Sequence, residues 1–279
     1  MIVNCKGRIL DLSSPQIMGI LNVTPDSFYD GGKYKDLSAA IDQVGMMIEE
    51  GAAIIDVGGM SSRPGADIIS EKEELSRVIP VIFEIARQYP DSIISVDTLR
   101  SKVADRAINA GASMVNDISG GIHDPEMIDV VSEHRAPYII MHMKGNPKTM
   151  QQEPDYGDVT LEVLSFFAER VRLMRSQGIN DVIIDPGFGF GKTIEHNYKL
   201  LEQLSVFRIL DAPLLCGVSR KSMIYKLLNI PPGDALNGTT AAHMIALMGG
   251  ANLLRVHDVK EAAQTIRIFM QVGRKSVTD

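Results

Sequence analysis

Short apolar runs recur along the chain, and each is followed by a longer segment in which apolar residues repeat with helical spacing. There are eight such runs: IMGIL, AIIDVGG, SIISVD, ASMVND, YIIMH, DVIIDPG, LLCGVSR and NLLRVHD. Short β-branched and aliphatic runs indicate buried strands, and their alternation with helices is typical of parallel βαβ units. The pattern therefore predicts eight parallel strands, each followed by a helix.

Local helix signals agree with this division of the chain. Ser70 and Glu73 form a capping-box pattern before an apolar-periodic stretch, and Asp124-Pro125 predicts an N-cap followed by a first-turn proline. Glycines stand where helix C-termini are expected, at Gly51, Gly111 and Gly178.

Eight strand–helix units are the content of a (β/α)8 TIM barrel, which typically needs about 250 residues. A pair of short strands around Lys6-Gly7 precedes the first unit, so we expect a TIM barrel with a short N-terminal β-hairpin. A doubly wound open sheet is the alternative, although it more often has fewer strands. No composition break divides the chain, and residues 1–279 are predicted to form a single domain.

The composition, with 45% hydrophobic and 23% charged residues, is that of a globular enzyme, and the net charge of −7 excludes a general basic surface. Nucleic acid is therefore not an expected partner, and any bound anion must meet locally placed cations. The start MIVNCKGR lacks the apolar core of a signal peptide, and no run is long enough to span a membrane. Two cysteines, Cys5 and Cys216, make no disulfide framework or metal cluster, which fits a reducing cytoplasm.

Polar residues follow the predicted strands at or near their carboxyl ends, where TIM barrels carry their chemistry. The set is Asn22, Asp56, Asp97, Asn116, His142, Asp185, Ser219 to Lys221, Arg255 and His257. One polar strand end is usually a helix cap, but eight together predict a shared cleft. Asp56 lies within its run and is expected to serve the barrel interior or to orient a neighbour. For His142 and His123 a structural role is favoured.

The glycine-rich segment DPGFGFGKT superficially suggests a nucleotide loop. The P-loop pattern requires glycine at position 186, which is Pro186, and the dinucleotide pattern would place its last glycine at Lys192. Neither motif is present. What remains is a tight loop in which Phe190 can lie against a flat ligand, whereas Phe188 is expected to pack loop against helix.

The segment NVTPDSFYDGG follows the first strand and is longer than a simple turn. It is either an irregular surface connection or a mobile loop that closes over a ligand. In the second case Asn22, Asp26 and Asp30 can reach a Mg²⁺ ion or its waters, and Phe28 offers an apolar face.

Eight segments, in order and spread over nearly the whole chain, carry a resemblance to the dihydropteroate synthase family: NVTPDSFYDGG, GGMSSRPGA, SVDT, VNDISGG, MHMKGNPKTMQ, DPGFGFGKTIEHN, GVSRKSMI and RVHDV. The resemblance implies a barrel that joins 6-hydroxymethyl-7,8-dihydropterin diphosphate to p-aminobenzoate and releases pyrophosphate and 7,8-dihydropteroate. It also implies Mg²⁺ as cofactor and a homodimer. The chain departs from the family's common pattern at Met60, which replaces Glu, at Ser62, which replaces Thr, and at Tyr29, where Ser is frequent.

A pterin edge presents N–H donors beside a carbonyl, so a specific pocket needs carboxylates, an amide and a cation. By resemblance Asp185 takes the amino group and the adjacent N–H, Asn116 and Asp97 meet the opposite ring nitrogens, and Lys221 reaches the carbonyl. The diphosphate needs locally placed positive charge, which Arg255 and His257 at the eighth strand end and Arg63 can supply, and the carboxamide of Asn22 suits Mg²⁺. Closure of the loop over a ligand would build a p-aminobenzoate pocket from Phe28, Pro64, Phe190 and Ser222. The expected substrate-binding set also includes Ser62, Met141 and Gly217.

An arylamine is already a neutral nucleophile, so no strong general base is required, and no Ser/His/Asp constellation is evident. We expect a dissociative displacement in which Asp97 stabilises the developing cation, while Arg63, Arg255 and His257 stabilise the departing pyrophosphate and Lys221 holds the ring. Two alternatives stay open at this stage. A methyltetrahydrofolate:corrinoid methyltransferase shares a pterin-binding barrel, and a non-catalytic pterin-binding protein would keep the pocket.

Overall fold

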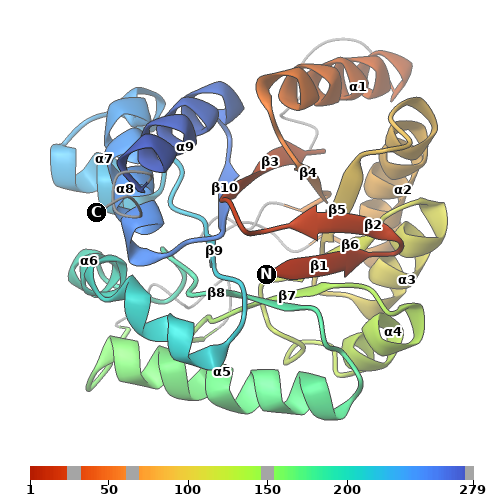
Figure 1. Ribbon diagram of the computed structural model, residues 1–279. Coiled ribbons are helices and arrows are strands. Elements are labelled where there is room, and N and C mark those ends of the chain that lie inside the picture. Colours follow the sequence, from red (N-terminus) through yellow and green to blue (C-terminus); the bar gives the residue numbers. More distant parts are fainter. Residues whose placement is uncertain (24–32, 61–68, 146–153, 274–279) are drawn as a thin grey trace.

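The computed structural model describes residues 1–23, 33–60, 69–145 and 154–273, and within them the strands form a barrel surrounded by helices (Figure 1). The barrel strands are β3 Gln16–Asn22, β4 Ile54–Gly58, β5 Ile93–Asp97, β6 Met114–Asp117, β7 Tyr138–Met141, β8 Val182–Asp185, β9 Leu215–Cys216 and β10 Leu253–Val256. All neighbouring pairs are parallel, in the order β8-β7-β6-β5-β4-β3-β10-β9. A parallel bridge between Ile184 and Leu214 joins the two edges. The predicted barrel is therefore confirmed, and the doubly wound sheet is excluded.

The helices lie outside this sheet, most of them between consecutive strands (Figure 1). The α-helices are α1 Lys33–Glu50, α2 Glu71–Gln88, α3 Ser101–Ala110, α4 Glu126–His134, α5 Val159–Ser176, α6 Ile194–Glu202, α7 Ser222–Leu228, α8 Leu236–Gly249 and α9 Val259–Gly273. Two 3₁₀ helices, η2 Leu204–Leu210 and η3 Pro232–Asp234, complete the described elements. No helix within the described ranges is long and apolar enough to cross a membrane.

The predicted N-terminal hairpin is also present, as the antiparallel pair β1 Ile2–Cys5 and β2 Arg8–Asp11. Its turn uses left-handed backbone at Lys6 (φ 53°) and Gly7 (φ 94°), which suits the twist of a two-residue hairpin. One face of the hairpin packs against the first inward-facing residues of the barrel strands in a cluster of Val3, Cys5, Leu10, Leu12, Met18, Ile54, Ile93, Met114, Ile139, Ile183, Leu215 and Leu253. The hairpin thus closes the amino end of the barrel and leaves the carboxyl end for chemistry.

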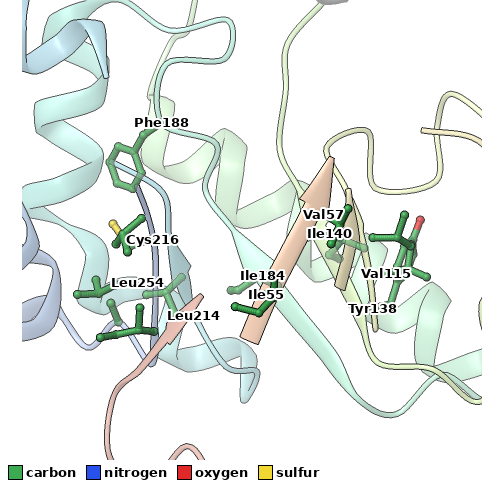
Figure 2. Close-up of a cluster of buried hydrophobic side chains, with 14 of the residues drawn as sticks. Ile55, Val57, Val115, Tyr138, Ile140, Ile184, Phe188, Leu214, Cys216 and Leu254 are labelled. Atoms are coloured by element: carbon green, nitrogen blue, oxygen red, sulfur yellow. The ribbon is translucent and has the colours of Figure 1, made fainter. Parts of the chain in front are cut away.

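The main core lies between the sheet and the helices. Alternate strand residues such as Ile55, Val57, Ile140 and Ile184 face outward into it and are buried (Figure 2). Phe188, from the turn after β8, belongs to the same core and is 1% exposed, so the packing role expected for it is confirmed. Burying a side chain of this size contributes about 1.5–3 kcal/mol, which makes this layer the principal source of stability.

Two of the predicted helix starts behave differently. Ser70 caps α2 as expected, because its hydroxyl accepts a hydrogen bond from Glu73 N at 3.2 Å. The N-cap of α4, however, is Pro125 and not Asp124. The Asp124 carboxylate instead serves two helices, since it accepts hydrogen bonds from Ser101 N (2.7 Å) at the start of α3 and from Glu126 N (3.2 Å).

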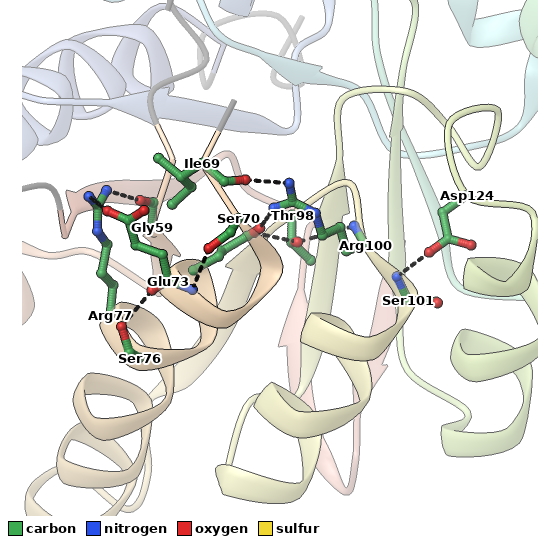
Figure 3. A network of polar contacts seen from close by, with 11 residues as sticks. Gly59, Ile69, Ser70, Glu73, Ser76, Arg77, Thr98, Arg100, Ser101 and Asp124 are labelled. Atoms are coloured by element: carbon green, nitrogen blue, oxygen red, sulfur yellow. Dashed lines mark hydrogen bonds and ion pairs between the residues drawn. The ribbon is translucent and has the colours of Figure 1, made fainter. Parts of the chain in front are cut away.

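A polar network joins α2 to the segments that follow β4 and β5 (Figure 3). Glu74 of α2 is fully buried, and its carboxylate accepts hydrogen bonds from Thr98 Oγ1 (2.6 Å) and from Arg100. Arg100 also donates to Ile69 O at 2.6 Å, and Arg77 donates to Gly59 O at 2.9 Å. The network therefore fixes the described residues on both sides of positions 61–68 relative to the end of β5.

Candidate active site

Residues that point into the barrel change from apolar to polar between the amino and carboxyl ends. The apolar strand residues packed against the hairpin form the first layer inside the barrel. Because strand side chains alternate, the residue two positions after each of them faces the interior as well. This second layer consists of Ile20, Asp56, Ser95, Asn116, Met141, Asp185, Gly217 and Arg255. One further step along β3 and β5 brings in Asn22 and Asp97. Six of the residues predicted to share a cleft therefore face the barrel interior above the apolar layer: Asn22, Asp56, Asp97, Asn116, Asp185 and Arg255.

Asp56 lies at the centre of this polar layer and is fully buried. Its Oδ2 accepts hydrogen bonds from Asn116 Nδ2 at 3.0 Å and from Arg255 Nε at 2.7 Å. The bond fixes the Asn116 amide so that its nitrogen faces Asp56 and its oxygen is left for a ligand donor. The expected role of Asp56, orienting its neighbours inside the barrel, is confirmed by these contacts.

Arg255 also contacts Asp97, through a bond of 2.7 Å from Nη2 to Oδ2, so its guanidinium bridges two carboxylates. The side chains of Arg255 and Asp97 are 16% and 11% exposed. Burial raises the pKa of Asp97 to about 7, although the Arg255 charge opposes this shift. The third guanidinium nitrogen, Nη1, bonds to none of the described residues.

Asp185 ends β8 and is 7% exposed. Its Oδ1 accepts a hydrogen bond from Gly187 N at 2.8 Å, while Oδ2 lies 3.6 Å from the position that a Cβ on Gly217 would occupy. A side chain at position 217 would therefore crowd the carboxylate. Burial raises the pKa of Asp185, and the Lys221 and Arg255 charges oppose the shift.

Lys221 stands at the start of α7, with its ammonium 4.0 Å from the centre of the Phe190 ring. Burial lowers its pKa to about 8, against the attraction of Asp185. Phe190 belongs to a separate apolar cluster with Leu99, Ile118 and Met141, against which Met60 and Met143 pack. The carboxyl end of the barrel thus combines the flat Phe190 ring and its apolar cluster with buried acceptors and a cation, and this combination suits a planar heterocycle.

The ends of β9 and β10 are joined by polar contacts. His257 Nδ1 lies 3.1 Å from Ser219 Oγ, which also accepts a hydrogen bond from His257 N at 3.2 Å. Arg220 forms a bidentate pair with Asp258, with both bonds at 2.8 Å. These bonds hold the segment that carries Lys221 against the segment that carries His257.

Asn22 ends β3 with its carboxamide oxygen 3.8 Å from the position of a Cβ on Gly58. The same position lies 3.6 Å from Asp97 Oδ2, so the two polar groups approach across a glycine. Among the described residues there is no cluster of three or more His, Cys, Asp or Glu side chains that could hold a metal ion.

Several predicted site residues lie outside the described ranges: Asp26, Phe28, Asp30, Ser62, Arg63 and Pro64. Ser222 is described and begins α7 directly after Lys221. The structure therefore brings together Asp97, Asn116, Asp185, Lys221 and Arg255, with His257 beside them.

Lys192 is the residue of this region that sequence reasoning missed. In the sequence it belongs to a segment that only superficially suggests nucleotide motifs, yet its side chain is buried at 2% exposure beside the turn after β8. His142, for which a structural role was favoured, contacts it: the two side chains meet at 3.1 Å between Nζ and Nδ1. The sequence feature that could have indicated a buried lysine is its position inside a glycine-rich, apolar segment.

Comparison with known proteins matches residues 18–257 to a family model described as pterin binding enzyme. The chain is 48% identical to the dihydropteroate synthase of Escherichia coli (strain K12) over 265 residues, covering 94% of this chain and 93% of that protein. It is 50% identical to the dihydropteroate synthase of Synechocystis sp. over 255 residues, covering 90% and 88%.

Solved structures that are similar to this chain include two dihydropteroate synthases. A Yersinia pestis dihydropteroate synthase in a sulfonamide drug complex superposes with a TM-score of 0.92 and 43% identity, covering 98% of this chain and 100% of that one. A Xanthomonas albilineans dihydropteroate synthase in complex with 7,8-dihydropteroate superposes with a TM-score of 0.87 and 39% identity, covering 98% and 99%.

Proposed function

This chain belongs to the pterin binding enzyme family, and we propose that the carboxyl end of its barrel carries out the dihydropteroate synthase reaction with the residues described above. The enzyme condenses 6-hydroxymethyl-7,8-dihydropterin diphosphate with p-aminobenzoate to give 7,8-dihydropteroate and pyrophosphate. The observation that carries the assignment of the site is the buried polar layer of Asp56, Asp97, Asn116, Asp185 and Arg255, with Lys221 at its edge.

Recognition of the pterin follows from the donor and acceptor pattern of this layer. Asp185 accepts from the amino group and neighbouring N–H, and its buried position makes an unmatched ligand costly. Asn116 offers its carboxamide oxygen because Asp56 holds the nitrogen. Lys221 donates to the ring carbonyl from above the Phe190 face.

The chemical step is a substitution at the pterin methylene carbon. The bond from carbon to the diphosphate oxygen breaks with its electron pair going to pyrophosphate, and the amine nitrogen of p-aminobenzoate forms the new bond and then loses a proton. Asp97, held by Arg255 at 2.7 Å, lies where a carboxylate can stabilise positive charge on the dihydropterin. Arg255 Nη1, His257 and Arg63 are proposed to meet the leaving anion.

Mg²⁺ is proposed as the cofactor, with Asn22 as its protein ligand. A hard cation prefers oxygen donors and keeps most of its waters while it binds substrate phosphates, so a single carboxamide oxygen at a strand end fits its needs. When bound, the ion would neutralise charge on the diphosphate.

The assay that tests the function mixes purified protein with the pterin diphosphate, Mg²⁺ and p-aminobenzoate and measures pyrophosphate release. Release that requires the arylamine is expected. Pyrophosphate release that is equal without the arylamine would indicate a hydrolase, and no release with intact pterin binding would favour a non-catalytic barrel. The methyltransferase alternative has no diphosphate to hold and predicts no release either, but transfer of a methyl group to a corrinoid.

We also propose a homodimer that works in the cytoplasm. Large apolar side chains are exposed on three neighbouring elements, at Val206 and Ile209 of η2, Leu227 and Leu228 of α7, and Ile245 and Met248 of α8. Such a surface is typical of a buried interface between subunits. Both cysteines are free and buried, which suits a reducing compartment.

A further inference from the structure

A lysine ammonium is buried beside the turn after β8 without an ion pair to any described carboxylate. Lys192 Nζ lies within hydrogen-bond distance of four acceptors: Gly187 O (2.9 Å), Phe190 O (3.0 Å), His142 Nδ1 (3.1 Å) and His142 O (3.2 Å). A buried ammonium is tolerated only when its protons are matched in this way. The acceptors come from two separate segments, the end of β7 and the turn after β8.

The turn that Lys192 holds carries two parts of the substrate site. Gly187 N donates to Asp185 Oδ1 at 2.8 Å and so sets the direction of the carboxylate. The Phe190 ring supports the Lys221 ammonium at 4.0 Å. The turn also packs closely on β7, because a Cβ on Gly187, whose φ is +71°, would lie 2.0 Å from His142 O.

The three carbonyl oxygens explain why a cation stands here. All three point toward the same buried atom, and among the described residues Gly187 O alone has another donor, Phe190 N at 3.1 Å. Without the ammonium, Phe190 O and His142 O would lose this donor, and the turn would rearrange to reach water. Burial lowers the pKa of Lys192 to about 7, while the nearby Asp185 charge favours its protonated form.

We propose that Lys192 is a positioning residue for pterin recognition, whose ammonium fixes the turn from Gly187 to Phe190 and thereby orients the Asp185 carboxylate and the Phe190 ring. This role rests on the proposed function. Lys192 touches no substrate in it and acts through Asp185 and Phe190.

The test compares Lys192→Met with a matched control, Lys199→Met. Lys199 is also a lysine of the segment after β8, but it lies at the surface in an ion pair with Asp158 at 2.7 Å. For Lys192→Met we expect at least about tenfold weaker binding of a non-reactive pterin by calorimetry and a matching rise in KM for the pterin diphosphate, with kcat changed by less than about threefold. Lys199→Met should match the wild type in all three.

A double-mutant cycle with Asp185→Asn separates positioning from general stability. If Lys192 acts through Asp185, adding Lys192→Met to Asp185→Asn should weaken pterin binding by less than about threefold further. A purely structural role predicts a lower Tm, fewer active molecules and an unchanged KM. If Lys192→Met does not fold, the cycle uses Lys192→Gln, whose uncharged amide lies one bond nearer the backbone and has two donor hydrogens instead of three.

Wild-type pterin affinity in a folded Lys192 variant, or full additivity with Asp185→Asn, would overturn the proposal. Wild-type turnover of the pterin diphosphate is measured first. If the wild type binds no pterin and releases no pyrophosphate, it is the proposed function that fails. If the wild type is active and the variant is unaffected, only the role of Lys192 fails.

Discussion

Asp185 is the residue that we propose binds the pterin most directly, because an ionised carboxylate only accepts hydrogen bonds and so matches the amino group and the adjacent N–H of the ring. Asp185→Asn places an amide donor against a ligand donor in a buried pocket, and we expect a loss of about 2–4 kcal/mol of pterin binding. Calorimetry with a non-reactive pterin measures it. Asp129→Asn, an exposed position on α4, is the control, and equal affinities for the two variants would remove Asp185 from the pocket.

Lys221 gives the site a pH dependence of known sign. Its pKa is lowered to about 8 by burial, so the ammonium that we propose donates to the pterin carbonyl is lost as the pH rises through 8. Pterin affinity should therefore fall above pH 8, and Lys221→Met should bind weakly at every pH and lose this decline.

Stability responds to the same pKa shift in the opposite direction. Between pH 8 and the ordinary lysine pKa of about 10.4 the unfolded chain binds this proton more tightly than the folded one, so the Lys221 contribution to the free energy of unfolding rises with pH in this window. Burial raises the pKa values of Cys5 and Cys216, whose contributions fall as their unfolded thiols ionise, so urea denaturation at each pH is the control that separates weaker binding from unfolding. An affinity that stays constant from pH 7 to 9.5 would contradict a charged Lys221 at the carbonyl.

The sequence could identify most of the polar residues of the site, because they stand at strand ends in a regular order. Asp97, Asn116, Asp185 and Arg255 needed only the barrel assumption to be grouped. Their mutual contacts could not be predicted, since Asp56 bonds residues 60 and 199 positions away in the chain. The burial of Lys192 could not be predicted, because its partners are mainly backbone carbonyls, which no side-chain pattern reveals.

At the scale of elements, the contact of α2 with the segment after β5 depends on the buried Glu74, whose carboxylate binds Thr98 and Arg100. Removing one partner of a buried, hydrogen-bonded charge pair costs about 3–5 kcal/mol, because the other charge is left without compensation. Glu74→Ala should lower the free energy of unfolding by about this amount in urea denaturation.

The neighbouring Glu73 provides the matched control for this prediction. It also pairs with an arginine, Arg77, but its side chain is 46% exposed, and exposed pairs contribute only about 0–1 kcal/mol. Glu73→Ala should therefore be nearly neutral. Similar losses for the two variants would show that burial of Glu74 does not decide the energetics of this network.

Strands were predictable at this scale because every barrel strand is a short apolar run, and all eight runs became strands. The length of each strand was harder to predict. The run LLCGVSR contains only the two-residue strand Leu215–Cys216, because the residues after it turn toward α7, with left-handed backbone at Arg220 (φ 52°). The sequence also places the N-cap of α4 at Asp124 instead of Pro125. The local pattern does not reveal that the Asp124 carboxylate has a second partner, Ser101, on another helix.

For the whole molecule, the exposed apolar side chains of η2, α7 and α8 predict self-association. Ile209 and Met248 are 79% and 71% exposed, and changing both to Glu should convert a dimer into a 30.5 kDa monomer in light scattering after gel filtration. Phe83→Glu, on α2 and 59% exposed, is the control that should stay dimeric. A monomeric wild type at micromolar concentration would refute the dimer.

The order of ligand binding is the other property of the whole molecule that the site predicts. Of the residues proposed to form the p-aminobenzoate pocket, the structure describes Phe190, Lys221 and Ser222. The other predicted members, Phe28 and Pro64, belong to positions 24–32 and 61–68, outside the described residues.

If the pocket is completed only when pyrophosphate and Mg²⁺ bring those segments to Asn22 and Arg255, the first ligands create the state that binds the arylamine. Titration of p-aminobenzoate, or of a sulfonamide that resembles it, should then give at least about tenfold higher affinity with pterin, pyrophosphate and Mg²⁺ present than with pterin alone. Leaving out Mg²⁺ is the control, and it should return the affinity to the value with pterin alone. Comparable affinities in all three titrations would mean that the pocket exists before the anion binds, and that NVTPDSFYDGG is only a connection between strand and helix.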